Sequence, residues 1–236
     1  MSKEPMRVAI MQPYFFPHLP YFQMAAAVDL FVVLDTVQYI RRGWVNRNQV
    51  LHDGRPRYLT VPVALQPRTT LIKDIRLAQD ADRGGRRIVN QLHATLGDAP
   101  AFEGMMDVAA PALAEIKPAR GLVDVNLAGL AEVFGALAIS TPVIRASQLA
   151  PRDRETASAY LIALCREVGA TEYVNAAGGR ALYDAAEFDR HNISLRFVEG
   201  APRMAAEDTG HSILNVLARN ELSTVRTMLG DVALLS

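Results

Sequence analysis

Two polar and aromatic segments near the start of the chain contain residue types that bind and activate small molecules. The first, residues 12–22, places Gln12, Tyr14, His18 and Tyr21 among three prolines. Prolines stiffen the backbone and so hold neighbouring side chains in position for binding. Histidine can act as a general base there, because its unperturbed pKa lies closest to neutrality. We therefore expect a binding loop with His18 as a catalytic candidate, and not only an apolar cover over a sheet edge.

The second segment, residues 35–48, follows another apolar run and is rich in hydrogen-bond donors. Its candidates for substrate binding are Gln38, Tyr39, Arg41, Arg42, Trp44, Asn46 and Arg47. Arginine forks grip phosphate or carboxylate groups, and the single tryptophan offers a stacking face to a sugar or a base. Asp35, at the start of the segment, is a second candidate base or a group that orients His18. A solvated basic loop is the alternative, and the position after a strand favours the binding site.

The apolar runs before these segments predict the elements that position them. Residues 8–11 and 30–34 are short and uninterrupted, which is typical of buried parallel strands, and residues 21–28 have the length and alanine content of a crossover helix. Ligands of open α/β sheets bind beyond the carboxyl ends of the strands. The expected strand–helix–strand unit therefore brings residues 12–22 and 35–48 to the same edge of the sheet.

The whole pattern predicts an α/β protein with a Rossmann-like, mixed but mainly parallel sheet, flanking helices and a helical middle segment. Alternating residues predict two strands at 57–63 and 71–77, and Pro62 marks the first as an edge or an end. Helices are predicted at 84–97, 122–137, 160–168, 213–217 and 222–228, and further strands at 142–145, 171–174 and 193–198. We interpret residues 1–236 as one domain in which 83–137 is a helical insertion.

Composition and charge exclude several classes of function. Lys plus Arg and Asp plus Glu both number 25, so the net charge is zero and no global field attracts nucleic acid or an anionic membrane. A single cysteine excludes an internal disulfide, and the histidines show no metal-ligand spacing. No segment approaches the roughly 18 apolar residues of a membrane span. We expect a cytoplasmic protein with a small-molecule substrate, no metal, no nucleic-acid partner and no membrane insertion; the cofactor stays unknown, and a homo-oligomer stays open.

Three later features are weaker candidates. Residues 175–179 could form an anion nest before a helix, and a plain strand-to-helix turn explains them equally well. Ser147 follows a predicted strand and would face the same edge of the sheet. Cys165 lies on the apolar stripe of its helix, so we assign it to the core and not to a nucleophile.

The pattern Gln-Pro-x-x-x-Pro-x-x-x-Tyr-Phe at 12–22, with Asp29, Asp35, Gln38-Tyr39 and Asn46-Arg47, resembles the bacterial WbqC-like family. Further segments that share the likeness are 59–63, 170–173 and 211–214. Members of that family are associated with surface polysaccharide gene clusters such as those for O-antigen, and acyl or aminoacyl transfer to an amino sugar has been suggested for some. The resemblance therefore implies a role in polysaccharide biosynthesis.

A more distant resemblance is to nucleotidyltransferases of the HIGH type, in which a strand, a histidine-containing loop and a helix bind nucleotide phosphates. His18 would stand for the first histidine, whereas Tyr21 replaces the second and Pro20 replaces the glycine. Proline has no N–H to offer a phosphate. This likeness supports the fold more than the chemistry.

The leading hypothesis is a transferase that attaches an acyl or aminoacyl group to a nucleotide-linked or phosphorylated amino sugar. His18 or Asp35 would be the base, and Gln12 and Asn46 would hydrogen-bond the substrate. The arginines at 41, 42 and 47 would neutralise its phosphates. Nucleotidyl transfer of the HIGH type and non-catalytic binding of a sugar nucleotide are the alternatives.

Overall fold

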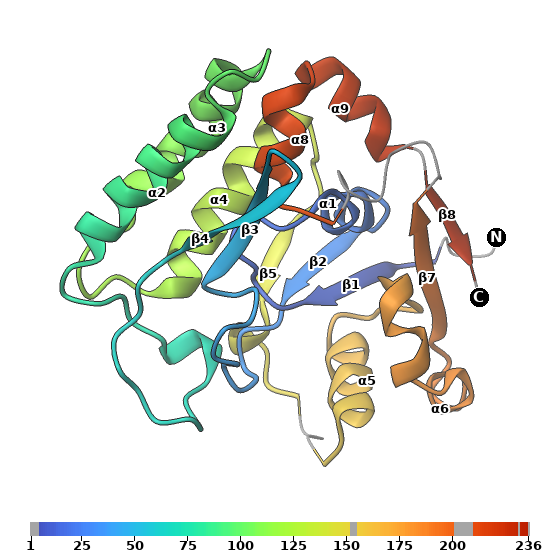
Figure 1. Ribbon diagram of the computed structural model, residues 1–236. Helices are drawn as coiled ribbons and strands as arrows, with labels where there is room; N and C mark the ends of the chain where they lie inside the picture. Colours follow the sequence, from blue (N-terminus) through green and yellow to red (C-terminus); the bar gives the residue numbers. More distant parts are fainter. Residues whose placement is uncertain (1–4, 152–154, 201–209, 231, 236) are drawn as a thin grey trace.

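A computed structural model describes residues 5–151, 155–200, 210–230 and 232–235, and its centre is a six-stranded sheet (Figure 1). The strands in spatial order are β5 (Val143–Arg145), β2 (Leu30–Val33), β1 (Arg7–Met11), β6 (Glu172–Ala176), β7 (Ser194–Gly200) and β8 (Val232–Leu235). The first five strands are parallel, and β8 pairs antiparallel with β7. The mixed, mainly parallel Rossmann-like sheet expected from the sequence is confirmed.

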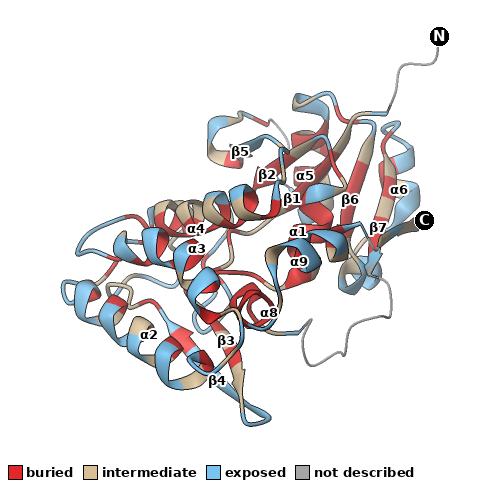
Figure 2. Cartoon of the chain, turned by 90° about the horizontal axis from the view of Figure 1, so that it is seen from above, coloured by how far each residue is buried: buried red, intermediate tan, exposed pale blue. Residues whose placement is uncertain are grey.

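Different helices cover the two faces of the sheet, as Figure 1 shows. One side is packed by α1 (Leu19–Ala26), α4 (Leu122–Leu137), α8 (Ile213–Arg219) and α9 (Leu222–Leu229), and the other by α5 (Ala157–Glu167) and α6 (Ala185–Asp189). Successive residues of a strand point to opposite faces. Ala9 accordingly joins the first core, and Val8 and Ile10 join the second. Both faces of β1 and β2 are buried, as the red strands in Figure 2 show.

The helical middle segment consists of α2 (Ala81–Leu96), α3 (Phe102–Ala114) and α4, which lie side by side in Figure 1. α2 buries Ile88, Leu92 and Leu96, a spacing that places them on one helix face. The two helices predicted here are present. α3 was not predicted, because its run is alanine-rich and carries a proline inside the helix. It packs against α4 and α8.

One predicted strand is wrong. Residues 71–77 contain a 3₁₀ helix, η1 (Ile72–Asp74), and among the described residues they make only isolated bridges, to Gln38, Val63 and Gly121, which lie outside the strands. Ile72 and Ile75 are both buried and lie three residues apart, which is the repeat of a 3₁₀ helix. The apparent alternation arose because the segment buries these side chains while its backbone bonds to the loop that follows β2, where Ile72 N donates to Val37 O.

The strand predicted at 57–63 belongs to a separate hairpin. β3 (Arg47–His52) and β4 (Arg55–Thr60) pair antiparallel as their own two-stranded sheet. β3 had been treated as part of the binding loop, so the partner of β4 was missed. Pro62 lies beyond the end of β4, as a proline near a strand end should.

The first testable prediction concerns Cys165, which is fully buried on α5. Burial raises the pKa of its thiol to about 12, so almost no thiolate exists near neutral pH. We expect the folded protein to resist thiol reagents at pH 8 and the urea-unfolded protein to react at once. Cys165→Ala should cost about 1–3 kcal/mol of stability. Rapid labelling of the native protein would contradict the placement.

Candidate functional site

A cavity lies where the strand order of the sheet reverses. The chain runs from β1 through α1 to its neighbour β2, whereas the neighbour on the other side, β6, comes much later. A crevice opens beyond the carboxyl ends at such a switch point, and open α/β sheets bind their ligands there. The cavity at this place has a volume of about 500 Å³. We call it the central cavity.

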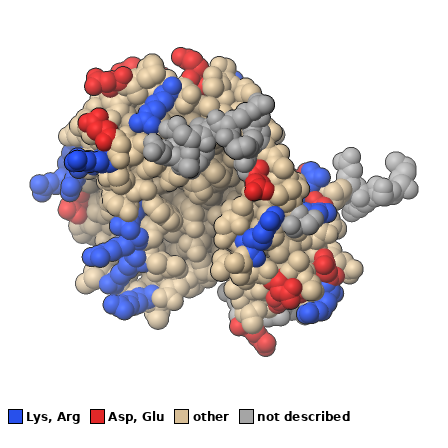
Figure 3. Space-filling model, turned by 45° about the vertical axis from the view of Figure 1, so that its right-hand side comes forward, with Lys and Arg blue, Asp and Glu red and all other residues tan. Residues whose placement is uncertain are grey.

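The wall of the central cavity is polar but uncharged. Its polar and aromatic lining residues are Gln12, Tyr14, His18, Trp44, Asn48, Tyr173, Asn175 and Tyr183. Its other lining residues are Ile10, Met11, Leu34, Leu161, Ala176, Gly178, Gly179, Leu182 and Gly210. Among the residues that the structure describes, no Lys, Arg, Asp or Glu lines it, and the hollow seen in Figure 3 is tan. Aromatic faces and amide groups of this kind suit the uncharged part of a sugar or a nucleoside.

The loop of residues 12–18 forms one wall of the cavity and is held through its backbone carbonyls. Asn126, a buried residue of α4, donates from Nδ2 to Pro13 O at 2.7 Å and to Val45 O at 2.7 Å. One amide therefore ties both binding segments to the same helix. This support explains how an irregular loop keeps a fixed shape.

The middle of the loop has a second set of supports. Asn48 Nδ2 donates to Phe15 O at 3.1 Å and to Phe16 O at 2.8 Å, and Ser212 Oγ donates to Phe16 O at 2.8 Å. Phe16 has a φ of 40°, which is uncommon for a side chain with a Cβ. Such strain persists only where the surroundings fix the backbone. Here the two buried side chains do so.

The second prediction tests this support. Asn126→Ala leaves two buried carbonyls without their donor, so we expect a loss of about 1–3 kcal/mol in the free energy of unfolding. Asn90→Ala on the exposed part of α2 is the matched control and should change it by under about 0.5 kcal/mol. Urea titration of both variants measures the difference. Equal stability of the two variants would show that the loop does not depend on this amide.

His18 lies at the entrance to α1, as its N-cap residue, and lines the central cavity. Burial lowers the pKa of its imidazole, so the ring is neutral near pH 7. Among the described residues the ring has no hydrogen-bond partner. A neutral imidazole that faces a cavity with a free ring nitrogen has the state that a general base requires.

Tyr14 and Tyr21 occupy different positions, although the sequence grouped them. Tyr14 lines the cavity, and the pKa of its hydroxyl is raised by burial and then by the nearby Tyr183. Tyr21 is fully buried beneath it and donates its hydroxyl to Gln12 O at 3.0 Å. The structure thus places Tyr21 behind the wall of the cavity, where it supports Gln12.

The opposite wall comes from the end of β6 and from the 3₁₀ helix η3 (Ala177–Leu182). Asn175 Oδ1 accepts from Ala176 N at 2.7 Å, which orients the Asn175 amide in the cavity wall. A Cβ added to Gly179 would lie 2.8 Å from Asn175 Nδ2, so glycine lets this amide keep its place. The sequence had offered 175–179 as an anion nest or a turn, and the structure brings it to the central cavity.

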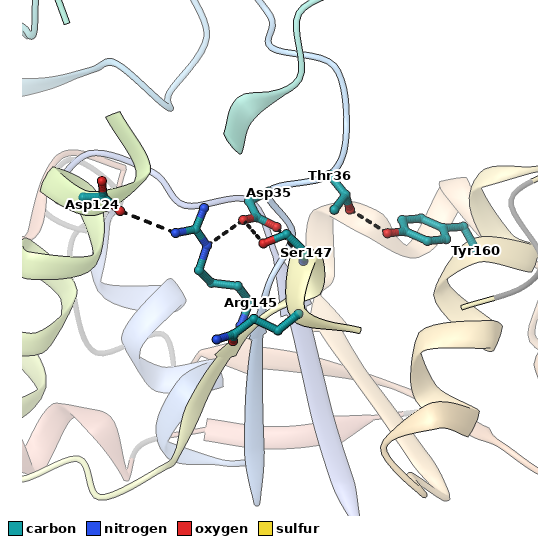
Figure 4. A network of polar contacts seen from close by, with 7 residues as sticks. Asp35, Thr36, Asp124, Arg145, Ser147 and Tyr160 are labelled. Carbon is teal, nitrogen blue, oxygen red and sulfur yellow. Dashed lines mark hydrogen bonds and ion pairs between the residues drawn. The ribbon is translucent and has the colours of Figure 1, made fainter. Parts of the chain in front are cut away.

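Asp35 lies in a separate network at the end of β2, shown in Figure 4. It is completely buried, and its Oδ2 accepts from Arg145 Nε and from Ser147 Oγ, both at 2.7 Å. Its Oδ1 accepts from Ser147 N at 2.9 Å. Arg145 also contacts Asp124 of α4 at 3.4 Å. Beside this network, Thr36 and Tyr160 share a buried hydrogen bond of 2.6 Å.

This network gives Asp35 a different setting from that of His18. Leu34 lines the central cavity, but Asp35 does not. Both of its carboxylate oxygens already accept hydrogen bonds, and a guanidinium neutralises its charge. The geometry suits a tie between β2, β5 and α4 better than a proton acceptor for a substrate.

The residues of the arginine-rich segment are distributed over two separate hollows. Tyr39, Arg41, Arg42 and Asn46 line a second hollow that shares no lining residue with the central cavity, and Gln38 lies in a depression beside it. Arg47 packs its guanidinium 4.4 Å from the ring centre of Tyr58 and donates to Arg42 O. Of the predicted substrate-binding residues, the central cavity brings together Gln12, Tyr14 and Trp44.

The sequence offered Asn175 only as part of the weak candidate 175–179, and it missed three further residues of the cavity wall, Asn48, Tyr173 and Tyr183. Asn48 and Tyr173 are both strand residues, and Asn48 closes the second predicted binding segment. Tyr183 follows η3 and carries no sequence signal that connects it to the binding loop.

The described residues contain no cluster of three or more His, Cys, Asp or Glu that could hold a metal ion. Helices in the same parts of the chain are too short or too polar to cross a membrane.

Comparison with known proteins supplies the family. The model of the WbqC-like protein family matches residues 12–208. The chain belongs to this family. Every lining residue of the second hollow, and all those of the central cavity except Ile10, Met11 and Gly210, fall inside the WbqC-like match.

One curated relative is "Uncharacterized protein Rv1507c" of Mycobacterium tuberculosis (strain ATCC 25618 / H37Rv). It is 29% identical over 199 residues, which is 82% of each chain. No solved structure matches this WbqC-like chain significantly. The comparisons therefore assign the family, and the chemistry has to be argued from the cavity.

Proposed function

We propose that the protein is a transferase that attaches an acyl or aminoacyl group to a nucleotide-linked or phosphorylated amino sugar. The observation that carries the proposal is His18, a neutral imidazole without a hydrogen-bond partner among the described residues, at the switch point of the sheet. It faces a cavity whose described lining is uncharged. The link to surface polysaccharides rests on the family resemblance.

The proposed step needs one proton acceptor. The sugar amine attacks the carbonyl carbon of the donor, a C–N bond forms, and the bond from that carbon to the leaving group breaks. The amine proton passes to the free imidazole nitrogen of His18, which must be neutral to accept it. The lowered pKa of His18 keeps it neutral near pH 7.

The rest of the wall fits the uncharged part of such a substrate. Gln12 and Asn175 offer amide groups to hydroxyls, and Trp44 and Tyr14 offer ring faces to a sugar or a base. The arginines at 41 and 42, which we expected to neutralise the substrate's phosphates, line the other hollow. A phosphate on a substrate in the central cavity would extend toward solvent, because no Lys or Arg is among the described residues that line the wall.

A turnover assay tests the proposal. The protein is incubated with nucleotide-linked amino sugars and acyl thioester or activated aminoacyl donors, and products are followed by mass spectrometry. We expect the mass of the acyl or aminoacyl group to appear on the sugar. The same sugar with a hydroxyl in place of the amine is the control, and it should react more slowly than the amino sugar.

Two other outcomes would replace the proposal. Binding of the sugar nucleotide without turnover for any donor would make the protein a binding module. Magnesium-dependent release of pyrophosphate from ATP would indicate nucleotidyl transfer, which the cavity at the strand ends would also accommodate.

A further inference from the structure

The second hollow, here called the arginine hollow, is a concave site with no assigned occupant. Its volume is about 360 Å³. It is lined by Arg41, Arg42, Arg68, Tyr39, Asn46, Ile75 and residues 63–67. Because it shares no lining residue with the central cavity, what it binds is independent of the transfer reaction proposed above.

The charge of the arginine hollow is not compensated by any acidic residue that the structure describes. Within that part of the chain, no Asp or Glu lines the hollow. None of the ion pairs among the described residues includes Arg41, Arg42 or Arg68. Three guanidinium groups around one concavity create a positive potential, and their planar forks match phosphate or carboxylate oxygens. The positive potential of the hollow therefore favours binding of an anionic group.

The backbone holds two of these arginines in a tight turn. Gly43 N donates to Ile40 O at 3.1 Å, and Arg42 between them has a φ of 61°. That left-handed conformation is unfavourable for a residue with a Cβ, and such residues cluster at ligand sites. Arg41 donates from Nη2 to Gln66 O at 2.5 Å, which fixes its side chain across the hollow.

Asn46 supplies a buried acceptor without a partner. Only 7% of the residue is exposed, and its Nδ2 donates to Val61 O at 3.0 Å. That bond fixes the orientation of the amide, and its Oδ1 accepts no hydrogen bond from any described residue. A buried acceptor of this kind is costly unless a donor reaches it. A ligand that carries a hydroxyl near its anionic group would provide one.

Two large aliphatic side chains border the same arginines. Leu65 lines the hollow and is 93% exposed, and Ile40 is 62% exposed in a depression shared with Arg41 and Arg68. An aliphatic chain that covered Leu65 and Ile40 would remove apolar surface from water, which is favourable. The arginines would meanwhile stay paired with the anionic group of the same ligand. The combination is that of a site for an amphiphilic molecule.

We propose that the arginine hollow binds a phosphate-bearing amphiphile. The phosphate pairs with Arg41, Arg42 and Arg68, a hydroxyl beside it donates to Asn46 Oδ1, and an aliphatic chain lies over Leu65 and Ile40. Binding of a single amphiphile molecule, and not general attraction to anions, is what this arrangement supports.

Matched probes test this by titration calorimetry. Glycerol 3-phosphate carries the phosphate and hydroxyls, and 1-octanoyl lysophosphatidic acid adds one short chain to the same head group. We expect the second probe to bind at least about tenfold more tightly, because the chain buries apolar surface. Arg42→Gln and Arg68→Gln should each weaken both probes about tenfold or more. Leu65→Ser should remove only the advantage of the chain.

Arg87→Gln on α2, an exposed arginine elsewhere, is the control and should bind both probes as the wild type does. Circular dichroism of each variant confirms that it is folded. Equal binding of the two probes would overturn the amphiphile, and unchanged binding in both arginine variants would overturn the site. Binding only to phosphatidic acid vesicles, with none to the monomeric probes, would replace it with a membrane-docking surface.

Discussion

Replacing His18 by asparagine is expected to lower the turnover of the proposed transfer by about two to four orders of magnitude while substrate binding persists. Asparagine keeps a hydrogen-bonding side chain of similar size but has no group that accepts a proton near neutral pH. His18 is half-buried and makes no side-chain hydrogen bond with any described residue, so its replacement should leave the fold intact. Steady-state kinetics with calorimetric binding of the sugar nucleotide separate the two effects.

The pH dependence gives this prediction a second readout. Only the neutral imidazole accepts a proton, so the rate should rise with pH through the pKa of His18 and then level off. Because burial lowers that pKa, the midpoint should lie below the ordinary value of about 6.5. In His18→Asn this limb should be absent.

His191→Asn is the matched control, because His191 is exposed at the turn after α6 and lines neither cavity. Its rate and pH profile should equal those of the wild type. If His18→Asn has an unchanged rate, another group is the base. If binding and turnover fall equally, His18 is a ligand contact, as a binding protein would require.

The sequence predicted the part of the site that depends only on residues close together in the chain. Residues 8–11 and 30–34 are strands whose carboxyl ends meet, and this alone places Gln12, His18 and the end of β2 at one edge. The binding loop could be recognised because its prolines and aromatics follow directly after a strand. These inferences need only short-range patterns.

The division of the second segment could not be predicted in this way. Trp44 lines the central cavity, whereas Arg42 and Asn46, two residues away on either side, line the arginine hollow. The turn at Gly43 and the hairpin β3–β4 decide which way each side chain points. Asn175 lay in a segment that the sequence offered as a candidate, but its meeting with the binding loop, and that of Tyr183, depends on β6 lying beside β1, and local patterns do not predict such a long-range pairing.

The contacts of Asp35 could not be predicted from local sequence either. A polar residue at the end of a buried strand is a reasonable candidate for a base. Ser147 was expected at the same edge of the sheet, but no local pattern indicated that Ser147 and Arg145 would both bond to Asp35. Their contact depends on β5 pairing with β2, more than a hundred residues away. If this network has only a structural role, breaking it should lower the free energy of unfolding and leave the pH profile of turnover unchanged.

Arg145→Met is therefore expected to lower the free energy of unfolding by about 3 kcal/mol, because it leaves the Asp35 carboxylate buried without its counter-charge. This value is at the lower end for buried pairs, because 28% of the Arg145 side chain is exposed and water screens part of the interaction. Urea unfolding measures it.

The double variant decides whether the loss comes from the pair. Asp35→Asn removes the carboxylate charge, so Arg145→Met should cost less in that background, with a coupling of about 0.5–3 kcal/mol. Arg86→Met, which breaks the exposed ion pair with Asp82, is the control and should leave stability nearly unchanged, because solvent screens such pairs. Additive effects of the two variants would mean that the contact does not stabilise the fold.

Turnover tests the other role of Asp35. If folded Asp35→Asn loses more turnover than folded Arg145→Met, Asp35 is again a candidate base. The buried and fully hydrogen-bonded carboxylate argues for the structural outcome, since a proton acceptor needs a free oxygen that the substrate can reach.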